Sequence, residues 1–514
     1  MNTTEFPVII IGAGPTGLVL AHLLARAGIR TLVLERLAST VTEARAVTID
    51  DESLRTLQAT GMLDTVLPNI TQGYGVTYYS WRNQVFAQID PPARDYGYLK
   101  RNAFRQQVLV RQLAEGLAHH PHAEIRFEHD VLSFAQDDDG VTLTVAQGTQ
   151  QHTLRCAWLV ACDGGRSPTR ERLGISLEGN TYGERWLIAD LLNRQTGHRH
   201  TRTYCDPARP AIRLPGPDGT VRYEFMLHDG EDPDAMLDET RVRDWIRQRE
   251  PSDATLPFAR KVVYTFHARV AQRWRDRRVF LAGDAAHLTP PFAGQGMNSG
   301  LRDAANLAWK LAAVVQGQLP DSLLTTYEQE RKPHAWALIR MAQRIGWYMQ
   351  PKTTWGAALT QGALRLACLI PAARDYILHL KFKPKPRFRQ GYFLPASSAE
   401  LAVPPGQLWP QPLVELPGGR RLLLDDCLGD GFAVLYRAGT TPPAAPNGIA
   451  ARQVAVVARA DDFLPQQIPS ELPNGTPPRT LVRDCDNILG PLLDAAGANA
   501  VILRPDRYVY AYAG

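Results

Sequence analysis

The sequence predicts an α/β fold, in which a Rossmann-like domain is divided by an inserted β-sheet and followed by a separate C-terminal α/β domain. Residues 8–35 alternate strand, glycine turn, helix and strand. Residues 181–269 contain longer and more polar strand segments, and a Pro/Lys-rich stretch at 381–389 precedes the last part of the chain. A length of 514 residues fits several domains, at roughly 150 residues each.

The first element is a βαβ unit. Val8–Ile11 is an apolar run that predicts a buried strand, residues 18–27 predict a helix, and Thr31–Leu34 predicts a second buried strand. Between strand and helix lies a GxGxxG turn with Gly12, Gly14, Pro15, Thr16 and Gly17.

Each glycine of this turn has a physical role. The first permits the tight turn, the second lets the backbone approach a pyrophosphate, and the third allows close packing of helix on strand. The phosphates would sit at the helix N-terminus, and Glu35, after the second strand, is placed to bind ribose hydroxyls. A merely structural glycine turn is the alternative, and the motif does not separate FAD from NAD.

A second glycine-rich loop points to a flavin. A buried strand at 279–282 runs into Gly283-Asp284, then into Pro291, Gly294, Gly296, Met297 and Asn298. Asp284 is suited to hold ribityl hydroxyls, and the helix that starts near Asn298 would aim its positive end at a reduced flavin. The alternative is an ordinary β–α turn with Asp284 as helix N-cap. His287, in the same loop, is expected to pack rather than to catalyse.

A third loop, residues 162–170, follows a strand at 157–161 and contains Asp163-Gly164. Alone it would be a turn. Because it lies between the other two loops in the sequence, we expect it to complete one cofactor site. Strands are also expected at 124–128, 141–145 and 153–160, with a hairpin turn at 137–140, and helices dominate from 298 to about 376.

Together these motifs resemble the single-component flavoprotein aromatic hydroxylases, the para-hydroxybenzoate hydroxylase-like enzymes, over about residues 5–395. Within that family the chain resembles the 3-(3-hydroxyphenyl)propionate hydroxylases, through segments such as 49–52, 101–104 and 306–310. The resemblance implies four parts. These are an FAD-binding domain at 1–180, a substrate-binding sheet at 181–269, a second FAD-binding part with helices at 270–395, and a thioredoxin-like domain at 400–514.

The resemblance also implies site residues. Arg36, Arg45, Gln106 and Asp163 join the glycine loops, Glu35 and Asp284 in binding FAD. Arg222 occupies the place of an arginine that approaches the flavin. Tyr204 and His267 are further catalytic candidates, for which a structural role stays open. The C-terminal part lacks a CxxC pair, so we expect no disulfide chemistry there.

The family activity is hydroxylation of a phenol. NADH or NADPH binds transiently and reduces FAD, O2 forms a flavin C4a-hydroperoxide, and the ring is hydroxylated ortho or para to its hydroxyl. We expect a hydroxyphenyl carboxylic acid hydroxylated ortho to its hydroxyl, with Arg209, Arg213 or Arg222 pairing with the carboxylate. Open alternatives are a monooxygenase that tailors a polyketide, a halogenase or flavin reductase, and a flavin-bearing sensor. The absence of a WxWxIP motif argues against the halogenase.

Composition excludes other classes. A net charge of +5 without a dense Lys/Arg stripe argues against nucleic-acid binding. The six scattered cysteines show no metal-ligand spacing and are typical of a cytoplasmic protein. Met1–Pro7 lacks a basic signal-peptide start, and the apolar stretch 355–370 is too short and too charged for a transmembrane helix. A homodimer is left open.

Overall fold

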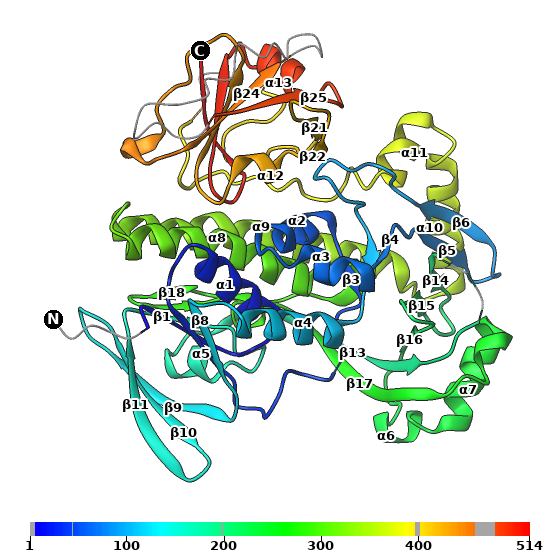
Figure 1. The fold of residues 1–514 in the computed structure, drawn as a ribbon. Helices are drawn as coiled ribbons and strands as arrows, with labels where there is room; N and C mark the ends of the chain where they lie inside the picture. Colours follow the sequence, from blue (N-terminus) through cyan, green and yellow to red (C-terminus); the bar gives the residue numbers. More distant parts are fainter. Residues whose placement is uncertain (1–5, 44, 196, 198, 396–400, 458–478) are drawn as a thin grey trace.

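The computed structural model describes residues 6–43, 45–195, 197, 199–395, 401–457 and 479–514. Helices α8 (Gly296–Val315) and α9 (Thr326–Met349) run through the middle of the molecule. The nucleotide-binding sheet lies on one side of these helices and the C-terminal domain on the other (Figure 1).

The nucleotide-binding sheet has six strands in the order β18-β19-β12-β1-β2-β8. They are β1 (Val8–Ile11), β2 (Thr31–Leu34), β8 (Ala123–Arg126), β12 (Trp158–Ala161), β18 (Arg275–Asp276) and β19 (Val279–Leu281). All neighbours pair in parallel except β18 with β19. Helix α1 (Pro15–Arg26) packs between this sheet and α8, so the predicted βαβ unit is confirmed.

A three-stranded antiparallel sheet, β9 (His129–Gln136), β10 (Val141–Gln147) and β11 (Gln150–Cys156), lies beside it. The turn at 137–140 is confirmed, since the Asp137 N–H donates to the Gly140 carbonyl. The strand that precedes the turn is β9. The segment predicted at 124–128 instead pairs with β2 as β8. The strand predicted at 153–160 divides into β11 and β12, two strands of different sheets.

The largest sheet has eight strands in the order β20-β17-β13-β16-β15-β14-β5-β6. Five come from the middle of the chain: β13 (Leu177–Leu191), β14 (Thr201–Cys205), β15 (Ala211–Pro215), β16 (Val221–Met226) and β17 (Phe258–Ala271). The others, β5 (Val76–Ser80), β6 (Val85–Ile89) and β20 (His287–Leu288), lie outside the range 181–269. The sheet is therefore not one contiguous insertion.

Strand β16 shows how this sheet divides two environments. Tyr223 and Phe225 are buried in a core that includes Val242 and Ile246 of α7 (Glu239–Arg249). Arg222 and the following even-numbered residues point to the other face, because successive strand side chains alternate. Arg222 donates to the carbonyl of Arg45 at 2.8 Å, which identifies its face as the one toward the nucleotide-binding domain.

Helices follow as predicted between 298 and 376. After α8 and α9 come α10 (Thr354–Ala367) and α11 (Pro371–Leu378). In the first part of the chain, α2 (Asp51–Ala59) and α4 (Gln106–Ala118) complete the surroundings of the glycine turn. Among the described residues no single helix is long and apolar enough to cross a membrane. The pair α10 and α11, bent by 109°, passes that test only when joined.

The C-terminal domain has a seven-stranded sheet in the order β22-β21-β25-β24-β23-β26-β27. Its strands are β21 (Leu413–Glu415), β22 (Arg421–Leu423), β23 (Ala433–Arg437), β24 (Arg452–Val457), β25 (Arg479–Asp484), β26 (Ala500–Leu503) and β27 (Val509–Ala513). A buried ion pair joins the domain to α9, because Arg504 lies 2.8 Å from Glu330 and both side chains are fully buried.

Candidate cofactor and substrate site

In the glycine turn, Gly12 and Gly17 have no room for a side chain, whereas Gly14 faces open space. Gly12 has a φ of +105°, and a Cβ there would lie 2.5 Å from the carbonyl oxygen of Cys162. A Cβ on Gly17 would lie 2.1 Å from the Gly12 carbonyl oxygen. A Cβ on Gly14 would meet no described atom within 4 Å. The open side of the turn is therefore at Gly14, where a pyrophosphate needs access.

The N-terminus of α1 opens on the same space. Its N-cap, Gly14, provides no side-chain cap, and Pro15 occupies the first turn. The Glu35 carboxylate accepts the Ala13 N–H at 2.8 Å and the Leu37 N–H at 3.0 Å. Glu35 thus holds the turn in place and keeps lone pairs for ribose hydroxyls. Arg36 beside it is exposed.

The second loop contacts the first at Thr16. Gly283 has a φ of +60°, and a Cβ on it would lie 2.6 Å from the Thr16 Oγ1. A Cβ on Gly300 in α8 would lie 2.3 Å from the same oxygen. Asp284 is half-buried, and its carboxylate has no hydrogen-bond or ion-pair partner among the described residues. Burial raises its pKa. A polar ligand such as a ribityl chain would supply the missing partners.

The third loop joins the other two. The Asp163 Oδ2 accepts the Thr169 N–H at 3.1 Å, whereas its Oδ1 is buried without a partner in the described structure. Arg170 donates to the carbonyl oxygens of Ala285 and Gly165, both at 3.0 Å. The three loops predicted from the sequence therefore meet. Two of them carry a carboxylate, Asp163 or Asp284, with oxygen atoms that have no partner within the described residues.

The Asn298 side chain holds the second loop in place. Its amide nitrogen donates to the Thr48 and Gly294 carbonyls at 3.1 and 2.6 Å, and its Oδ1 accepts the Asp50 N–H at 3.1 Å. Both amide hydrogens and one acceptor site of the side chain are therefore used within the protein, and the cofactor-binding role of Asn298 stays a prediction. Gly296 and Met297 in the same turn are half-buried.

Gln106 and Arg222 position a backbone segment rather than project into open space. The Gln106 Oε1 accepts the N–H groups of Arg45 and Ala46 at 3.0 and 2.7 Å. Arg222 holds the carbonyl of Arg45 and forms an ion pair with Asp190 at 2.6 Å. The Arg45 side chain is 61% exposed, so it is accessible to a ligand.

Two catalytic candidates lie elsewhere. Tyr204 stacks on Tyr79 at 5.2 Å and lies under the Arg249 guanidinium at 4.9 Å, in the core on the α7 side of the sheet. His267 lies 3.1 Å from the Thr181 hydroxyl, and burial lowers its pKa. It faces away from Phe266 because the two are adjacent on β17. The structure does not bring either residue to Arg222.

Two arginines expected to bind a substrate carboxylate are already paired. Arg213 is fully buried and lies 2.7 Å from Asp253. Arg209 forms two bonds to Glu231, at 2.6 and 3.0 Å, and stacks on a tryptophan. Sequence alone could not reveal these pairs, because each partner is at least 22 residues away.

His287 is confirmed as a packing residue. Its Nε2 lies 2.7 Å from the Asp303 carboxylate, and its ring stacks on Trp274. Asp303 also accepts the Gly283 N–H at 3.0 Å and pairs with Arg331 at 2.9 Å. Burial opposes ionisation of Asp303, but His287 and Arg331 outweigh it and hold its pKa below the usual value. Sequence reasoning missed Asp303, which anchors the second loop.

No sequence pattern indicates a further feature of the site, an aromatic wall on the Arg222 face of the sheet. Trp186 lies 5.7 Å from Phe292, and Phe266 lies 6.1 Å from the same ring, both edge-on. Phe292 belongs to the second loop, so the wall adjoins the nucleotide-binding loops. Glu224, on the same face, is buried, and burial raises its pKa to about 7.

A buried acidic cluster lies behind the second loop. Asp50, Asp51 and Glu52 bring three carboxylates together. Arg302 contacts Asp50 and lies 2.6 Å from Glu52, and Lys383 lies 2.8 Å from Glu52. The Pro/Lys-rich stretch around Lys383 is therefore packed against the domain, and Arg302 and Lys383 pair with carboxylates of this cluster.

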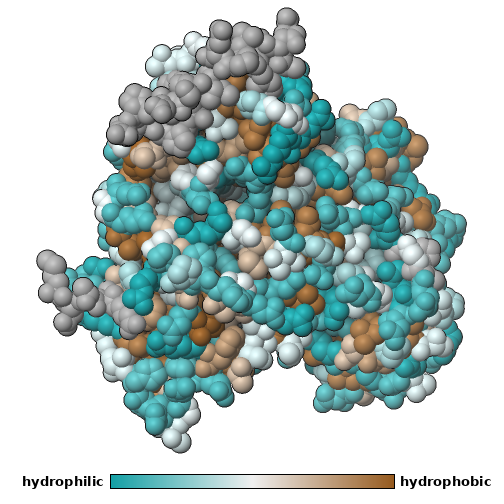
Figure 2. Space-filling view, viewed as in Figure 1, coloured by the Kyte–Doolittle hydropathy of each residue, from teal (hydrophilic) through white to brown (hydrophobic). Residues whose placement is uncertain are grey.

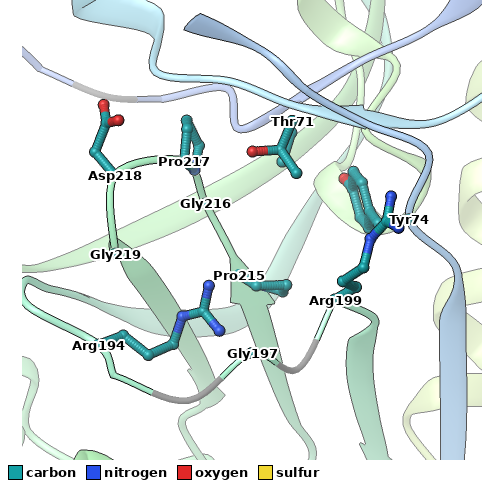
Figure 3. Close-up of a pocket in the computed structure, with 11 residues that line it drawn as sticks. Thr71, Tyr74, Arg194, Gly197, Arg199, Pro215, Gly216, Pro217, Asp218 and Gly219 are labelled. Atoms are coloured by element: carbon teal, nitrogen blue, oxygen red, sulfur yellow. The ribbon is translucent and has the colours of Figure 1, made fainter.

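The described structure also contains a cavity of about 190 Å³ (Figure 3). Its walls are Thr71, Tyr74 and the β15–β16 turn, and two arginines, Arg194 and Arg199, extend along it. Arg199 donates to the Gly73 carbonyl at 2.7 Å, which fixes that arginine at the wall.

Comparison with known proteins identifies the family. The FAD binding domain model matches residues 5–342, and the HcaD C-terminal domain model matches residues 406–514. A 3-(3-hydroxy-phenyl)propionate/3-hydroxycinnamic acid hydroxylase of Mycobacterium sp. (strain JLS) is 37% identical over 99% of this chain and 89% of its own. The namesake of Klebsiella pneumoniae is 38% identical over 98% and 91%. The chain belongs to the FAD-dependent aromatic hydroxylases.

Solved structures agree with this family. The flavin-dependent monooxygenase PieE, in complex with FAD and substrate, aligns with a TM-score of 0.80 over 99% of this chain and 97% of its own. At 22% identity this shows a shared fold. OxyS anhydrotetracycline hydroxylase of Streptomyces rimosus aligns with a TM-score of 0.74 at 27% identity, over 99% and 96%.

The hydroxylase binds FAD, and the three loops fit that cofactor. Gly14 leaves room for the pyrophosphate, Glu35 for a ribose, and the unpartnered oxygens of Asp163 and Asp284 for further hydroxyls. When bound, FAD supplies the redox chemistry, with NAD(P)H as the reductant typical of this class. In the chain itself, the Arg45 segment held by Gln106 would help to orient the bound cofactor, and the aromatic rings next to it would help to exclude water.

Proposed function

We propose that the protein hydroxylates a phenolic acid, a hydroxyphenyl ring with a short carboxylate side chain, ortho to the existing hydroxyl. It would use O2 and NADH or NADPH. The observation that carries this proposal is the identity of 37–38% over nearly the whole chain to hydroxylases named for 3-(3-hydroxyphenyl)propionate and 3-hydroxycinnamate.

The aromatic wall is the proposed substrate-binding surface. Trp186, Phe266 and Phe292 offer edges and faces to a planar ring, and such contacts favour aromatic ligands. The wall also includes Met349 of α9. Because Trp186 and Phe266 belong to the eight-stranded sheet and Phe292 to the second loop, the ring would lie between the sheet and that loop. This arrangement supports a substrate site next to the flavin.

Arg101 is the proposed partner of the substrate carboxylate. It replaces Arg209 and Arg213 as the candidate, because these two arginines already form ion pairs with carboxylates of the protein. Its guanidinium lies over the Tyr74 ring at 5.1 Å, and its positive charge acts on the half-buried Tyr78 at the edge of the aromatic wall. Within the described residues Arg101 has no carboxylate partner, and its Nε is buried without a hydrogen bond. An anionic substrate would satisfy it.

Glu224 is the proposed acceptor of the phenol proton. It lies on the Arg222 face of β16, next to the aromatic wall, and a carboxyl with a pKa of about 7 exchanges protons efficiently near neutral pH. Removing the phenol proton makes the ring a better nucleophile. Arg222 and Asp190 are the charged groups that tune this carboxyl.

The C-terminal domain is proposed to be thioredoxin-like without redox chemistry. The strand order β24-β23-β26-β27, with only the first pair parallel, is that of a thioredoxin core. Cys427 is buried, and burial raises its pKa to about 11, so its thiol stays protonated. A cytoplasmic location and a homodimer remain predictions.

The test compares 3-(3-hydroxyphenyl)propionate with its uncharged alcohol analogue, by substrate-stimulated NAD(P)H oxidation and product analysis. We expect the acid to have a kcat/KM at least about tenfold higher, because a buried charge-assisted pair is lost with the alcohol. Arg101→Met should remove that difference and leave the alcohol unaffected. Equal efficiency of acid and alcohol in the wild type would contradict the carboxylate assignment.

A second candidate is hydroxylation of a polycyclic phenol. The similarity to OxyS, whose name specifies anhydrotetracycline, favours it. Stimulation of NAD(P)H oxidation by a polycyclic phenol and not by phenolic acids would establish this alternative.

A further inference from the structure

Helices α10 and α11 and the end of α9 expose an unusual amount of apolar surface. Twelve large hydrophobic side chains are exposed in the described structure, and eight of them lie within residues 347–376. They are Trp347, Tyr348, Trp355, Leu359, Leu366, Leu369, Ile370 and Tyr376. Figure 2 shows brown surface at the upper right, where α10 and α11 lie in Figure 1. Such a concentration marks an interaction surface.

Helix α10 is amphipathic, but its large apolar side chains face outward. At 100° per residue, Trp355, Leu359 and Leu366 project within about 40° of one another, and they are 86%, 75% and 67% exposed. Ala357 and Gln361 project from the opposite side and are buried, and Gln361 donates to the Cys205 carbonyl at 2.9 Å. The helix is thus fixed to the eight-stranded sheet by one face and presents its apolar stripe to the outside.

The same region is basic. Residues 344–378, which make up this surface, contain four Lys or Arg and a single acidic residue, Asp375. The segment therefore carries a net charge of +3, more than half of the +5 of the whole chain. Lys352, just before α10, and Arg374, in α11, are both exposed. Positive charge and exposed apolar side chains therefore coincide on one part of the surface.

We propose that α10, α11 and the end of α9 form a docking surface for an anionic lipid bilayer, on which the protein lies without crossing it. Tryptophan, tyrosine and leucine side chains enter the headgroup boundary, and flanking lysines and arginines contact anionic headgroups. Charge decides between this occupant and a second copy of the chain. A two-fold contact would bring the same segment, with its net charge of +3, against itself.

The proposal is independent of the substrate. It also places the bilayer behind the aromatic wall, because Met349 at the end of α9 packs in that wall while Trp347 and Tyr348 beside it are exposed. An apolar aromatic compound dissolved in the bilayer would lie close to the substrate-binding surface.

The test is co-sedimentation of the FAD-bound full chain with vesicles of phosphatidylcholine containing one quarter phosphatidylglycerol, and with pure phosphatidylcholine vesicles. We expect binding to the anionic vesicles that weakens as salt rises. The double variant Leu359→Ser/Leu366→Ser should bind these vesicles with an affinity reduced by at least about tenfold. Leu132→Ser/Leu394→Ser, at exposed positions outside the surface, is the matched control and should bind as the wild type does.

Retained FAD and an unchanged circular dichroism spectrum verify the fold of both variants. Absence of binding to anionic vesicles at low salt would overturn the proposal, as would undiminished binding of the Leu359/Leu366 variant. Sedimentation velocity supplies the third outcome. If the wild type is an oligomer that this variant dissociates, and no vesicle binding occurs, a second copy covers the surface and the lipid proposal is wrong.

Discussion

Arg222 and Asp190 form a two-point ion pair, with N–O distances of 2.6 and 3.0 Å, across the adjacent strands β16 and β13. The remaining terminal nitrogen of Arg222 donates to the Arg45 carbonyl. One side chain therefore ties the eight-stranded sheet to the segment that Gln106 holds from the nucleotide-binding domain.

Arg222→Lys should break this connection, because an ammonium cannot reproduce the planar fork that spans Asp190 and the Arg45 carbonyl. We expect kcat/KM for hydroxylation to fall by about 10- to 100-fold, since small displacements of reacting groups are costly. The ratio of hydroxylated product to NAD(P)H consumed should also fall. Arg209→Lys, in an ion pair on the same sheet, is the control, and an equal loss there would refute a specific role for Arg222.

Asp284→Ala should weaken FAD binding by about 10- to 100-fold, the loss of one charge-assisted hydrogen bond of roughly 1.5–3 kcal/mol. The half-buried carboxylate has no partner within the described residues, so its removal should not lower the stability of the FAD-free protein. Titration of FAD by fluorescence and urea unfolding of the apoprotein measure the two effects. Wild-type FAD affinity in a folded variant would show that the loop assignment is wrong.

Much of the cofactor site was predictable because its signals are local. The turn around Gly12, the Asp284 loop and the Asp163 loop each combine a strand end with a glycine at a positive φ that other residues rarely adopt. Asn298 shows the limit, because no sequence pattern indicates that its side chain donates to the Thr48 and Gly294 carbonyls of the protein itself.

The substrate region was less predictable because its signals are not local. Alternation along β16 defined two faces, but only α7 and the distant Arg45 carbonyl decide which one meets the nucleotide-binding domain. Strands β5 and β6 join the sheet from the first 90 residues of the chain. Arg213 was expected at the substrate and is instead buried against Asp253, a pairing that no sequence pattern predicts.

Glu224 should make stability depend on pH. Burial raises its pKa from 4.5 to about 7 in the folded protein, so its contribution is fully present below pH 4.5 and is lost as pH rises through 7. Glu224→Gln removes that loss. The apoprotein variant should match the wild type near pH 4.5 and exceed its free energy of unfolding at pH 8, by up to about 3 kcal/mol. Urea unfolding at both pH values measures the difference.

The same substitution tests the proton-acceptor proposal. In the wild type, hydroxylation should increase with pH through an apparent pKa near 7, and Glu224→Gln should lower the rate and abolish that inflection. A variant that gains stability at pH 8 but keeps the inflection would mean that another group accepts the phenol proton.

Arg504→Met should strongly destabilise the protein. Arg504 is fully buried between Glu330 and Asp506, so its removal leaves buried carboxylates undercompensated, at a cost of about 3–5 kcal/mol. Arg437→Met, in a partly exposed pair with Asp494, should cost less than about 1 kcal/mol. Urea unfolding with intact FAD content monitored in parallel measures both, and similar small effects would show that the domain contact is weak.

The most direct test of the central claim is turnover of the FAD-bound protein with 3-(3-hydroxyphenyl)propionate as the aromatic substrate, NAD(P)H and isotopically labelled O2. The account predicts that the substrate accelerates NAD(P)H oxidation and that the product is the catechol carrying one labelled oxygen on the ring carbon ortho to the original hydroxyl. NAD(P)H oxidation that yields only hydrogen peroxide with every phenolic acid supplied, or a product without labelled oxygen, would contradict it.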